Sequence, residues 1–225
     1  MKNVFVLSKK NIALLGMGTV GKAVYEEIKG NVSSVLVKDI TKKRNIHISE
    51  KIITNDFEEI IQDKNIDIVI ELIGGETPAY NYIKRSIKSN KNVITANKEV
   101  MGKYGEELLE LAEKNNVFLL YEASVAGGIP IISPLVSDLS ANDFSSIRGI
   151  INGTTNYILT KMANQKLELA EVLREAQDLG YAEADPTSDI DGFDAQYKIS
   201  ILSRIAFNTN VSIDQIYVEG ISNIK

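Results

Sequence analysis

A glycine pattern near the start of the chain constrains its fold more than any other feature. Residues 16–21 read Gly-Met-Gly-Thr-Val-Gly, between an apolar run over residues 11–15 and a helical pattern over residues 19–28. A strand, a G-x-G-x-x-G turn and a helix start, in this order, are typical of a dinucleotide-binding unit. We therefore predict a nucleotide site here. The alternative is an unliganded tight turn in an α/β protein.

Each glycine of this motif has its own physical role. Gly16 permits the tight turn, Gly18 lets a pyrophosphate approach the backbone, and Gly21 lets the helix pack closely on its strand. The N–H groups of the first helical turn then face the phosphates, with the helix dipole behind them. The residues predicted to bind the cofactor here are Gly16, Met17, Gly18, Thr19, Val20 and Gly21.

The loop after the next apolar run, residues 32–37, bears on the choice between NAD and NADP. An acid at this point accepts hydrogen bonds from the ribose hydroxyls of NAD, whereas cations pair with the 2′-phosphate of NADP. The loop carries one acid, Asp39, among four cations, which are Lys38, Lys42, Lys43 and Arg44. We predict NADP, with Lys38 and Arg44 as ligands, and keep NAD and a solvated charged loop as alternatives.

Alternating strands and helices over residues 1–125 predict an α/β fold with a Rossmann-type, doubly wound parallel sheet. The strand over residues 66–73 ends in Gly74 and Gly75, at the sheet edge where such folds bind ligands, so Gly74 joins the predicted cofactor site. Residues 4–7 are read as an edge strand or leader. The other strands are expected over residues 11–15, 32–37, 52–54, 92–95 and 117–121, and the helices over 19–28, 56–62 (capped by Asp56), 77–89 and 99–115.

From residue 126 the pattern changes, and residues 126–225 are predicted to form a second domain of α+β type. Thr154 or Thr155 is expected to cap its second helix, and Gly180 to end its third. The expected helices cover residues 131–139, 154–165, 169–179 and 193–207, with a strand over 144–151 and an acidic loop over 181–192.

Composition narrows the chemistry and the partners. The chain has no cysteine and a single histidine, His47, which excludes a thiolate nucleophile and makes a histidine triad or multi-histidine metal site improbable. A net charge of −5 without a long basic run argues against nucleic acid, and no apolar run approaches the ~20 residues of a membrane span. The lack of cysteine makes the cytoplasm the default compartment.

A second group of charged residues lies in the carboxyl-terminal half. Asp194 and Lys198 are four residues apart and so share one helix face. The loop before them is acidic and suits a cationic ligand group such as an α-ammonium. A surface ion pair is the alternative for Asp194 and Lys198. A metal is the alternative for the loop acids, although their spacing differs from a calcium loop; these acids are Glu183, Asp185, Asp189 and Asp191.

Five stretches together resemble homoserine dehydrogenase, in order and across essentially the whole chain. The first is shared by all Rossmann dehydrogenases, and the last three are specific to this family. The stretches are residues 16–21, 95–98, 122–130, 152–156 and 180–198. The resemblance implies NAD(P)-dependent interconversion of L-homoserine and L-aspartate 4-semialdehyde, a step of threonine and methionine biosynthesis.

The resemblance also implies roles for individual residues. Lys198 is implied as the proton donor to the aldehyde oxygen, with Asp194 contacting the substrate. Lys98 is implied to lie between nicotinamide and substrate, where an ammonium stabilises developing charge. The implied substrate-binding residues are Gly153, Thr154, Gly180, Glu183, Asp189 and Asp194. A sodium site is implied at Glu122 and the carbonyls of Val125, Gly127 and Ile129.

Assembly and length follow from the same resemblance. It implies a homodimer through residues 144–151 and their neighbouring helices. Family members usually continue beyond residue 221, so the chain is expected to be an amino-terminal portion. Two other dehydrogenase readings fit less well, because aspartate-semialdehyde dehydrogenase needs a cysteine and dihydrodipicolinate reductase a histidine-rich motif. A non-catalytic module that senses the NADPH/NADP ratio is the alternative from a different class.

Overall fold

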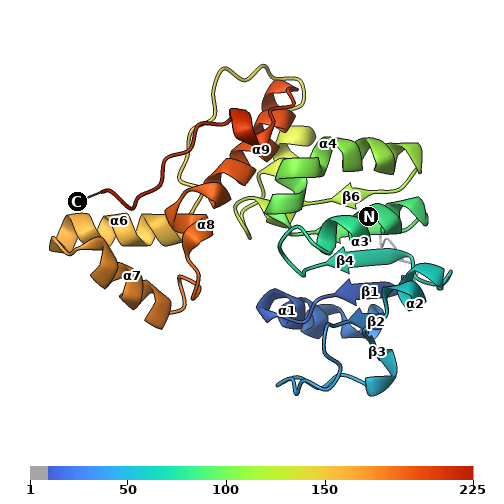
Figure 1. The fold of residues 1–225 in the computed structure, drawn as a ribbon. Coiled ribbons are helices and arrows are strands. Elements are labelled where there is room, and N and C mark those ends of the chain that lie inside the picture. The colour runs from blue at the N-terminus through green and yellow to red at the C-terminus, as the bar shows by residue number, and fades with distance from the viewer. Residues whose placement is uncertain (1–9, 225) are drawn as a thin grey trace, which may run out of the picture. The chain divides into compact units, whose positions relative to one another are not determined.

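The computed structural model describes residues 10–224, which form two compact units (Figure 1). The first unit comprises the chain up to Val100 together with Tyr104–Ser124, and the second comprises Met101–Lys103 together with the chain from Val125 onward. The edge strand or leader predicted at residues 4–7 lies outside the described residues. Within the described part, no helix is both long enough and apolar enough to cross a membrane.

The first unit is built on a six-stranded parallel sheet with the order β3-β2-β1-β4-β5-β6. Strand β1 lies in the middle of the sheet. The order runs outward from β1 to β3 on one side and from β4 to β6 on the other, as the arrows in Figure 1 show. This topology confirms the predicted Rossmann-type fold. The strands are β1 (Ile12–Leu15), β2 (Val32–Leu36), β3 (Ile53–Thr54), β4 (Ile68–Glu71), β5 (Asn92–Thr95) and β6 (Leu119–Leu120).

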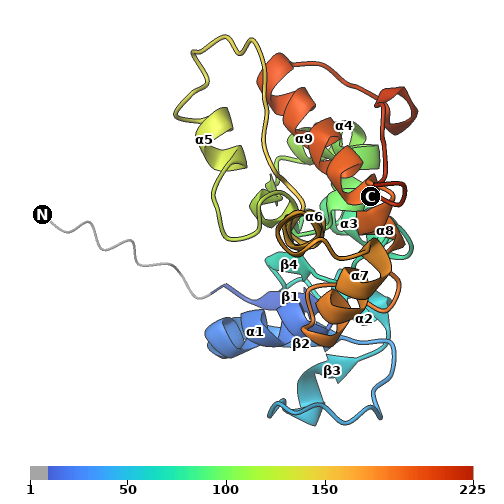
Figure 2. The same ribbon diagram turned by 90° about the vertical axis from the view of Figure 1, so that its left-hand side faces the viewer.

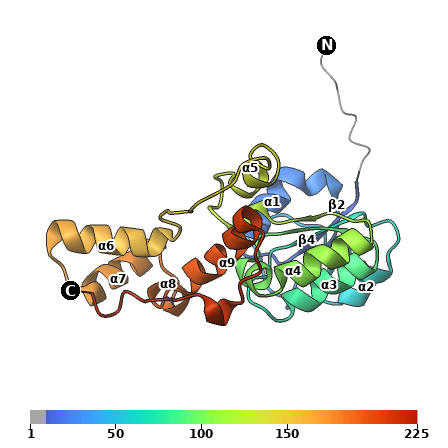
Figure 3. The ribbon, with the colours of Figure 1, turned by 90° about the horizontal axis from the view of Figure 1, so that it is seen from above.

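Helices cover both faces of this sheet. Helix α1 (Thr19–Ile28) lies on one face, and α2 (Phe57–Gln62), α3 (Ala79–Lys88) and α4 (Lys98–Lys114) lie on the other (Figure 3). Short 3₁₀ turns cover Lys29–Asn31 (η1), Glu50–Ile52 (η2) and Glu122–Ser124 (η3). Asp56 caps α2 as predicted, since its carboxylate accepts the Glu58 N–H at 2.8 Å.

The continuous apolar character of β1 follows from its position between these two layers. Because side chains alternate along a strand, Leu14 packs on the α1 side with Tyr25, whereas Leu15 packs on the opposite side with Phe57 and Ile60. All four residues of β1 are buried. Burial of one large aliphatic side chain contributes about 1.5–3 kcal/mol, so both faces of this strand stabilise the sheet.

The second unit contains α5 (Ile132–Val136), α6 (Gly153–Gln165), α7 (Leu169–Asp178), α8 (Thr187–Ile190), α9 (Phe193–Phe207) and the 3₁₀ turn η4 (Ile213–Gln215). Helices α6 and α7 lie side by side (Figures 1 and 3), and buried Ile158 and Val172 belong to one apolar cluster between them. Ile190 of α8 and Ile221 join this cluster. Gly180, with φ of +78°, follows the end of α7 as predicted.

The strand predicted over residues 144–151 is not formed. These residues belong to an irregular loop that runs from α5 to α6 (Figure 2), and Ile150 within it is 78% exposed. The described part of the second unit contains helices but no strand, which corrects the α+β character predicted for it. The sequence of residues 144–151 does contain the apolar and β-branched residues that favour a strand. A strand also needs a neighbouring strand that pairs with its N–H and C=O groups, and the described part of this unit contains no other strand.

Candidate functional site

A cavity of about 1140 Å³ lies at the carboxyl ends of β1, β2 and β4 in the first unit. The glycine motif and the predicted NADP loop line this cavity together, and Leu72, Ile73 and Tyr82 add apolar surface. The predicted cofactor residues that line it are Gly16, Met17, Gly18, Thr19, Lys38 and Arg44; those that do not are Val20, Gly21, Gly74 and Lys98. A cavity lined by both apolar side chains and several cations suits a nucleotide with phosphates.

The three motif glycines differ in what requires them. Gly16 has φ of +98°, and a Cβ there would lie 2.7 Å from the carbonyl oxygen of Leu72. A Cβ on Gly21 would overlap the carbonyl of Gly16. Both glycines are therefore needed by the fold itself. Gly18 has φ of −74°, and a Cβ there would meet no atom within 4 Å, so the fold does not require glycine at this position.

The amino terminus of α1 lies at the cavity, which Gly18 and Thr19 both line. Gly18 is its N-cap and provides no side-chain hydrogen bond to the first turn. The first N–H groups of a helix have no intrahelical partner, and together with the helix dipole they favour an anion. A phosphate beside Gly18 would accept hydrogen bonds from these N–H groups. In other helices a side-chain cap accepts them.

Two residues of the charged loop are engaged in the loop's own structure. The Arg44 guanidinium donates to the carbonyls of Lys42 and Asp39, both at 2.8 Å. The carboxylate of Asp39 accepts the hydroxyl of Thr41 at 2.7 Å and its N–H at 2.8 Å, and these bonds lower the pKa of Asp39. Asp39 is thus ionised, and its carboxylate is hydrogen-bonded within its own loop. Arg44 uses two of its five N–H donors in these bonds and keeps the others for a ligand.

A buried carboxylate that sequence reasoning missed fixes the turn after β4. Glu71 is fully buried and accepts the N–H groups of Ile73 at 2.7 Å and Gly74 at 3.3 Å, and the hydroxyl of Thr95 at 2.6 Å. Asn97 donates to the carbonyl of Gly75 at 2.7 Å. The signal that could have revealed Glu71 is an acid inside an otherwise apolar run, which has to find hydrogen-bond donors when buried.

Lys98 is the first residue of α4, directly after the N-cap Asn97, whose side chain accepts the Val100 N–H at 3.1 Å. A cation at this position faces the positive end of the helix dipole. Helix stability alone therefore does not favour a lysine here, which fits a role in binding or chemistry.

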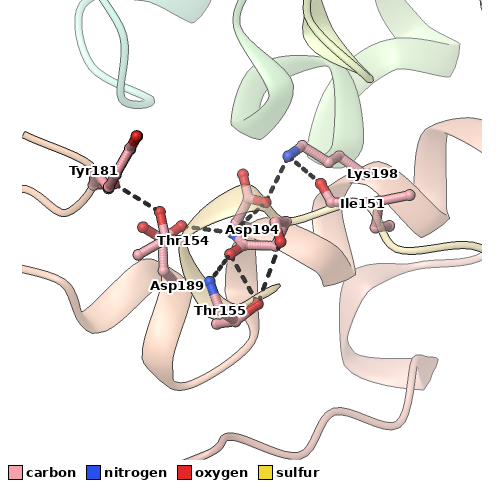
Figure 4. Close-up of polar contacts among 8 residues, drawn as sticks. Ile151, Thr154, Thr155, Tyr181, Asp189, Asp194 and Lys198 are labelled. Carbon is pink, nitrogen blue, oxygen red and sulfur yellow. Dashed lines mark hydrogen bonds and ion pairs between the residues drawn. The ribbon is translucent and has the colours of Figure 1, made fainter. Parts of the chain in front are cut away.

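The second group of charged residues is centred on a buried ion pair on α9. Lys198 Nζ lies 2.6 Å from Asp194 Oδ2, and the two side chains are 14% and 1% exposed, respectively (Figure 4). The surface-pair alternative is therefore wrong. Lys198 also donates to the carbonyl of Ile151 at 2.7 Å. Removing charges from water is costly, so a buried pair of this kind is weak support for stability and better support for a functional role.

Asn152 connects this ion pair to a neighbouring acid and to α6. Its Nδ2 donates to Asp189 Oδ1 at 2.7 Å and to Asp194 Oδ2 at 2.8 Å. Its Oδ1 accepts the N–H of Thr155 at 2.8 Å, so Asn152 is the N-cap of α6. The prediction of Thr154 or Thr155 as the cap was wrong. Asparagine is among the most favoured N-cap residues, and this preference could have found it.

The other predicted substrate residues differ in whether they contact the network of Asn152, Asp189, Asp194 and Lys198. Thr154 donates to the carbonyl of Tyr181 at 2.9 Å, which joins the start of α6 to the residue after Gly180 (Figure 4). Gly153 is the first residue of α6. Glu183 is exposed, and the hydrogen bonds that join Asn152, Asp189, Asp194 and Lys198 within residues 10–224 do not include its side chain. Over the same residues, no three His, Asp or Glu side chains are grouped as a metal site would need, which leaves the metal alternative for the acidic loop unsupported.

The predicted sodium ligands fall in a short stretch of chain after β6. Glu122 belongs to η3 in the first unit, and Val125, Gly127 and Ile129 belong to the second unit. Ala126 and Gly127 have φ of +61° and +57°, so the chain turns sharply between them. Val125 is buried, whereas Ile129 is 69% exposed.

Two family models match the chain. The model described as the NAD-binding domain of homoserine dehydrogenase matches residues 16–122, and the model described as homoserine dehydrogenase matches residues 130–225. The chain belongs to the homoserine dehydrogenase family. Its glycine motif and cavity lie within the first match, and its buried ion pair lies within the second. This membership excludes aspartate-semialdehyde dehydrogenase and dihydrodipicolinate reductase as its family.

Individual homoserine dehydrogenases agree with this assignment. The Bacillus subtilis enzyme is 45% identical over 95% of the chain, which covers 52% of that protein. The crystal structure of the Thiobacillus denitrificans enzyme matches with a TM-score of 0.86 at 40% identity, over 96% of this chain and 53% of that one. A hyperthermophilic archaeal homoserine dehydrogenase in complex with NADPH matches with a TM-score of 0.82 at 27% identity, over 97% and 75%. The chain spans about half the length of the curated relatives it matches.

Proposed function

We propose that this chain carries the nucleotide and catalytic sites of an NAD(P)-dependent homoserine dehydrogenase, which interconverts L-homoserine and L-aspartate 4-semialdehyde. The observation that carries the proposal is the buried pair of Lys198 and Asp194, which Asn152 contacts. The pair lies in the part of the chain that the model described as homoserine dehydrogenase matches. A bound oxidised nicotinamide would supply the acceptor for the hydride that leaves the alcohol carbon of homoserine. The hydroxyl proton of the substrate must leave in the same reaction.

Lys198 is the proposed carrier of this proton. An ammonium has three N–H donors, and within the part of the chain that the structure describes Lys198 uses two of them, toward Asp194 and the Ile151 carbonyl. The third remains for a substrate oxygen. In the reductive direction Lys198 donates a proton to the forming alkoxide, and in the oxidative direction its neutral form accepts the hydroxyl proton. The lack of cysteine and the single histidine leave few other candidate acids.

The amino acid end of the substrate is proposed to bind beside this pair. Asp189 and Asp194 present carboxylate oxygens around Asn152, and carboxylates suit an α-ammonium group. Thr154, Gly153, Gly180 and Glu183 complete the proposed substrate residues. Lys98 is proposed to orient the substrate carboxylate and to stabilise developing charge.

The full gene product, incubated with NADP and L-homoserine, tests the proposal through the absorbance of reduced nicotinamide. Turnover that needs L-homoserine supports the enzyme. Tight NADP binding without turnover would favour the alternative of a nucleotide-sensing module instead.

NADP is the proposed cofactor, since Lys38, Lys42, Lys43 and Arg44 all line the nucleotide cavity while Asp39 is bound to Thr41. One related structure, the archaeal enzyme, is a complex with NADPH. Removing Lys38 by Lys38→Ala is expected to weaken NADP binding by about 10–100-fold, the effect of one charge-assisted hydrogen bond. NAD binding, measured by the same titration, should hardly change. An unchanged ratio of the two affinities would contradict the assignment, and Lys64→Ala, an exposed lysine outside the cavity, is the control.

The motif glycines give a separate prediction on the same cavity. Gly18→Ala is expected to fold normally and to weaken NADP binding about tenfold or more, because its Cβ would occupy space left for a phosphate. Gly16→Ala is expected to lower stability by about 1–3 kcal/mol, because its positive φ and the Leu72 carbonyl both resist a side chain. Gly30→Ala, where a Cβ also meets no atom, is the matched control. Thermal melting and nucleotide titration measure the two effects, and full NADP affinity in Gly18→Ala would be the contrary result.

We further propose a sodium ion at Glu122 and the carbonyls of Val125, Gly127 and Ile129. Within residues 10–224 no backbone N–H group donates to the carbonyls of Val125 or Gly127, and such oxygens are ligands for a hard cation. A rise in melting temperature with sodium but not with choline would support it; equal melting temperatures would exclude it.

A homodimer and a cytoplasmic location complete the proposal. The loop before α6 exposes Ile150, and Ile129 and Val136 are exposed nearby in the chain, which is apolar surface suited to a partner subunit. Sedimentation of the full gene product distinguishes a dimer from a monomer. The proposed cytoplasmic location rests on the lack of cysteine in the sequence.

A further inference from the structure

We propose that Asn152 is a positioning residue, which holds the carboxylates of Asp189 and Asp194 and thereby aims the Lys198 ammonium. This inference rests on the proposed function. Asn152 lies in the chain just before α6, and it contacts α9 and α8 across 42 and 37 residues of sequence. It was expected neither as a cap nor as a site residue.

The side-chain amide of Asn152 is fully used, and this fixes its orientation. The backbone N–H of Thr155 can only donate, so it faces the amide oxygen at 2.8 Å, and the Thr155 hydroxyl donates to the same oxygen at 2.9 Å. The amide nitrogen then faces the two carboxylates, which when ionised can only accept. With 9% of the residue exposed, little water is available to replace these bonds.

The two N–H bonds keep two like charges close together. Asp189 Oδ1 and Asp194 Oδ2 both lie within 2.8 Å of one nitrogen atom, and carboxylates at such short range repel each other. The amide donors oppose this repulsion and fix one oxygen of each group. Because Asp194 Oδ2 also accepts Lys198 at 2.6 Å, the direction of the ammonium depends on an oxygen that Asn152 holds.

The residue before Asn152 holds the other end of the ion pair. The Ile151 carbonyl accepts the Lys198 ammonium at 2.7 Å (Figure 4). The Asn152 amide donates to Asp194 at 2.8 Å. Two consecutive residues, Ile151 and Asn152, thus hydrogen-bond to the cation and to the acid of the proposed catalytic pair, respectively. The hydrogen bond from the Thr155 N–H to Asn152 Oδ1 joins these two residues to the start of α6, a helix of 13 residues.

A purely structural role as a helix cap makes a different prediction. Asparagine, aspartate and serine are nearly equal as N-caps, because each offers a side-chain oxygen to the first turn. Asn152→Ser and Asn152→Asp therefore keep the cap, but the first loses the two amide donors, and the second adds a third carboxylate beside Asp189 and Asp194. A cap alone would leave activity intact in both variants.

The test measures kcat, the KM for L-homoserine, NADP affinity and melting temperature in the full gene product. We expect Asn152→Ser to lower kcat about 10²-fold, since misplacing a catalytic group by about 1 Å has this effect, with NADP affinity and melting temperature close to wild type. Asn152→Asp should lower kcat further and raise the KM for L-homoserine. Asn164→Asp, an exposed residue of the same helix, is the control and should retain full activity.

The outcomes separate this inference from the proposed function. Wild-type kcat in both Asn152 variants, with an active wild-type protein, would overturn the positioning role alone. A wild-type protein without homoserine turnover would overturn the proposed function and this inference with it. A double variant, Asn152→Ser with Asp194→Asn, adds a coupling test: losses that simply multiply would contradict a shared role, whereas a double loss close to the larger single loss supports it.

Discussion

Lys198→Ala is expected to lower kcat for L-homoserine by ~10²–10⁴-fold in the full gene product, the contribution of a positioned general acid. NADP affinity should hardly change, because the nucleotide cavity is lined by residues of the first unit. Steady-state kinetics and nucleotide titration measure the two quantities. The split between kcat and cofactor affinity distinguishes a proton carrier from a residue that supports the fold.

Lys161 provides the matched control for this prediction. It forms an ion pair with Glu175 in the same unit, between helices α6 and α7. The Glu175 side chain is 38% exposed and that of Lys161 20%, so the acid of this pair lies at the surface, unlike Asp194. Lys161→Ala should leave kcat near wild type, since exposed pairs contribute only ~0–1 kcal/mol and no chemistry. Near-normal turnover in Lys198→Ala would transfer the role of proton donor to Lys98.

Asp194→Asn is expected to affect both stability and catalysis. Breaking a buried ion pair by removing one partner costs about 3–5 kcal/mol, because the remaining charge is left without its counter-ion. Asp194 is 1% exposed and Lys198 14%, so the pair is of this buried class. Turnover should fall and the KM for L-homoserine should rise, since the lost charge serves Lys198, Asn152 and the proposed substrate ammonium. Denaturant unfolding and kinetics measure these effects.

The corresponding surface variant is Glu175→Gln, which removes the acid of the exposed pair with Lys161. Its unfolding free energy should change by ~1 kcal/mol or less, without loss of turnover. If Asp194→Asn behaved like Glu175→Gln in both measurements, Asp194 would have neither the energetic nor the catalytic role assigned to it.

Local sequence signals predicted the elements with clear ends. The helices over residues 19–28 and 193–207 were predicted with their observed bounds, because a glycine precedes each start and the apolar pattern continues to each end. Strand β4 is shorter than its apolar run, since Gly74 and Gly75 adopt positive φ and Leu72 and Ile73 already lead into that turn. Residues 144–151 have the composition of a strand, but the described part of the second unit contains no strand to pair with them. A local sequence pattern does not show whether a partner strand exists.

The missed residues of the candidate site share one physical property: their partners are distant in sequence. Glu71 depends on Thr95, and Asn152 depends on Asp189 and Asp194. Propensity and spacing describe neighbours within a few residues, so they place Asp194 and Lys198 on one face but cannot show that Asn152 joins them. Burial of the pair was equally beyond the sequence, since the same spacing occurs on exposed helices.

The transfer of one labelled hydrogen tests the central claim most directly. The full gene product is incubated with L-aspartate 4-semialdehyde and NADPH that carries deuterium at the transferable position of the nicotinamide, and the product is analysed by mass spectrometry and proton NMR. The proposed reaction predicts L-homoserine with one deuterium on its alcohol carbon and an equal amount of oxidised cofactor. Semialdehyde recovered unchanged, or L-homoserine without the label, would contradict it.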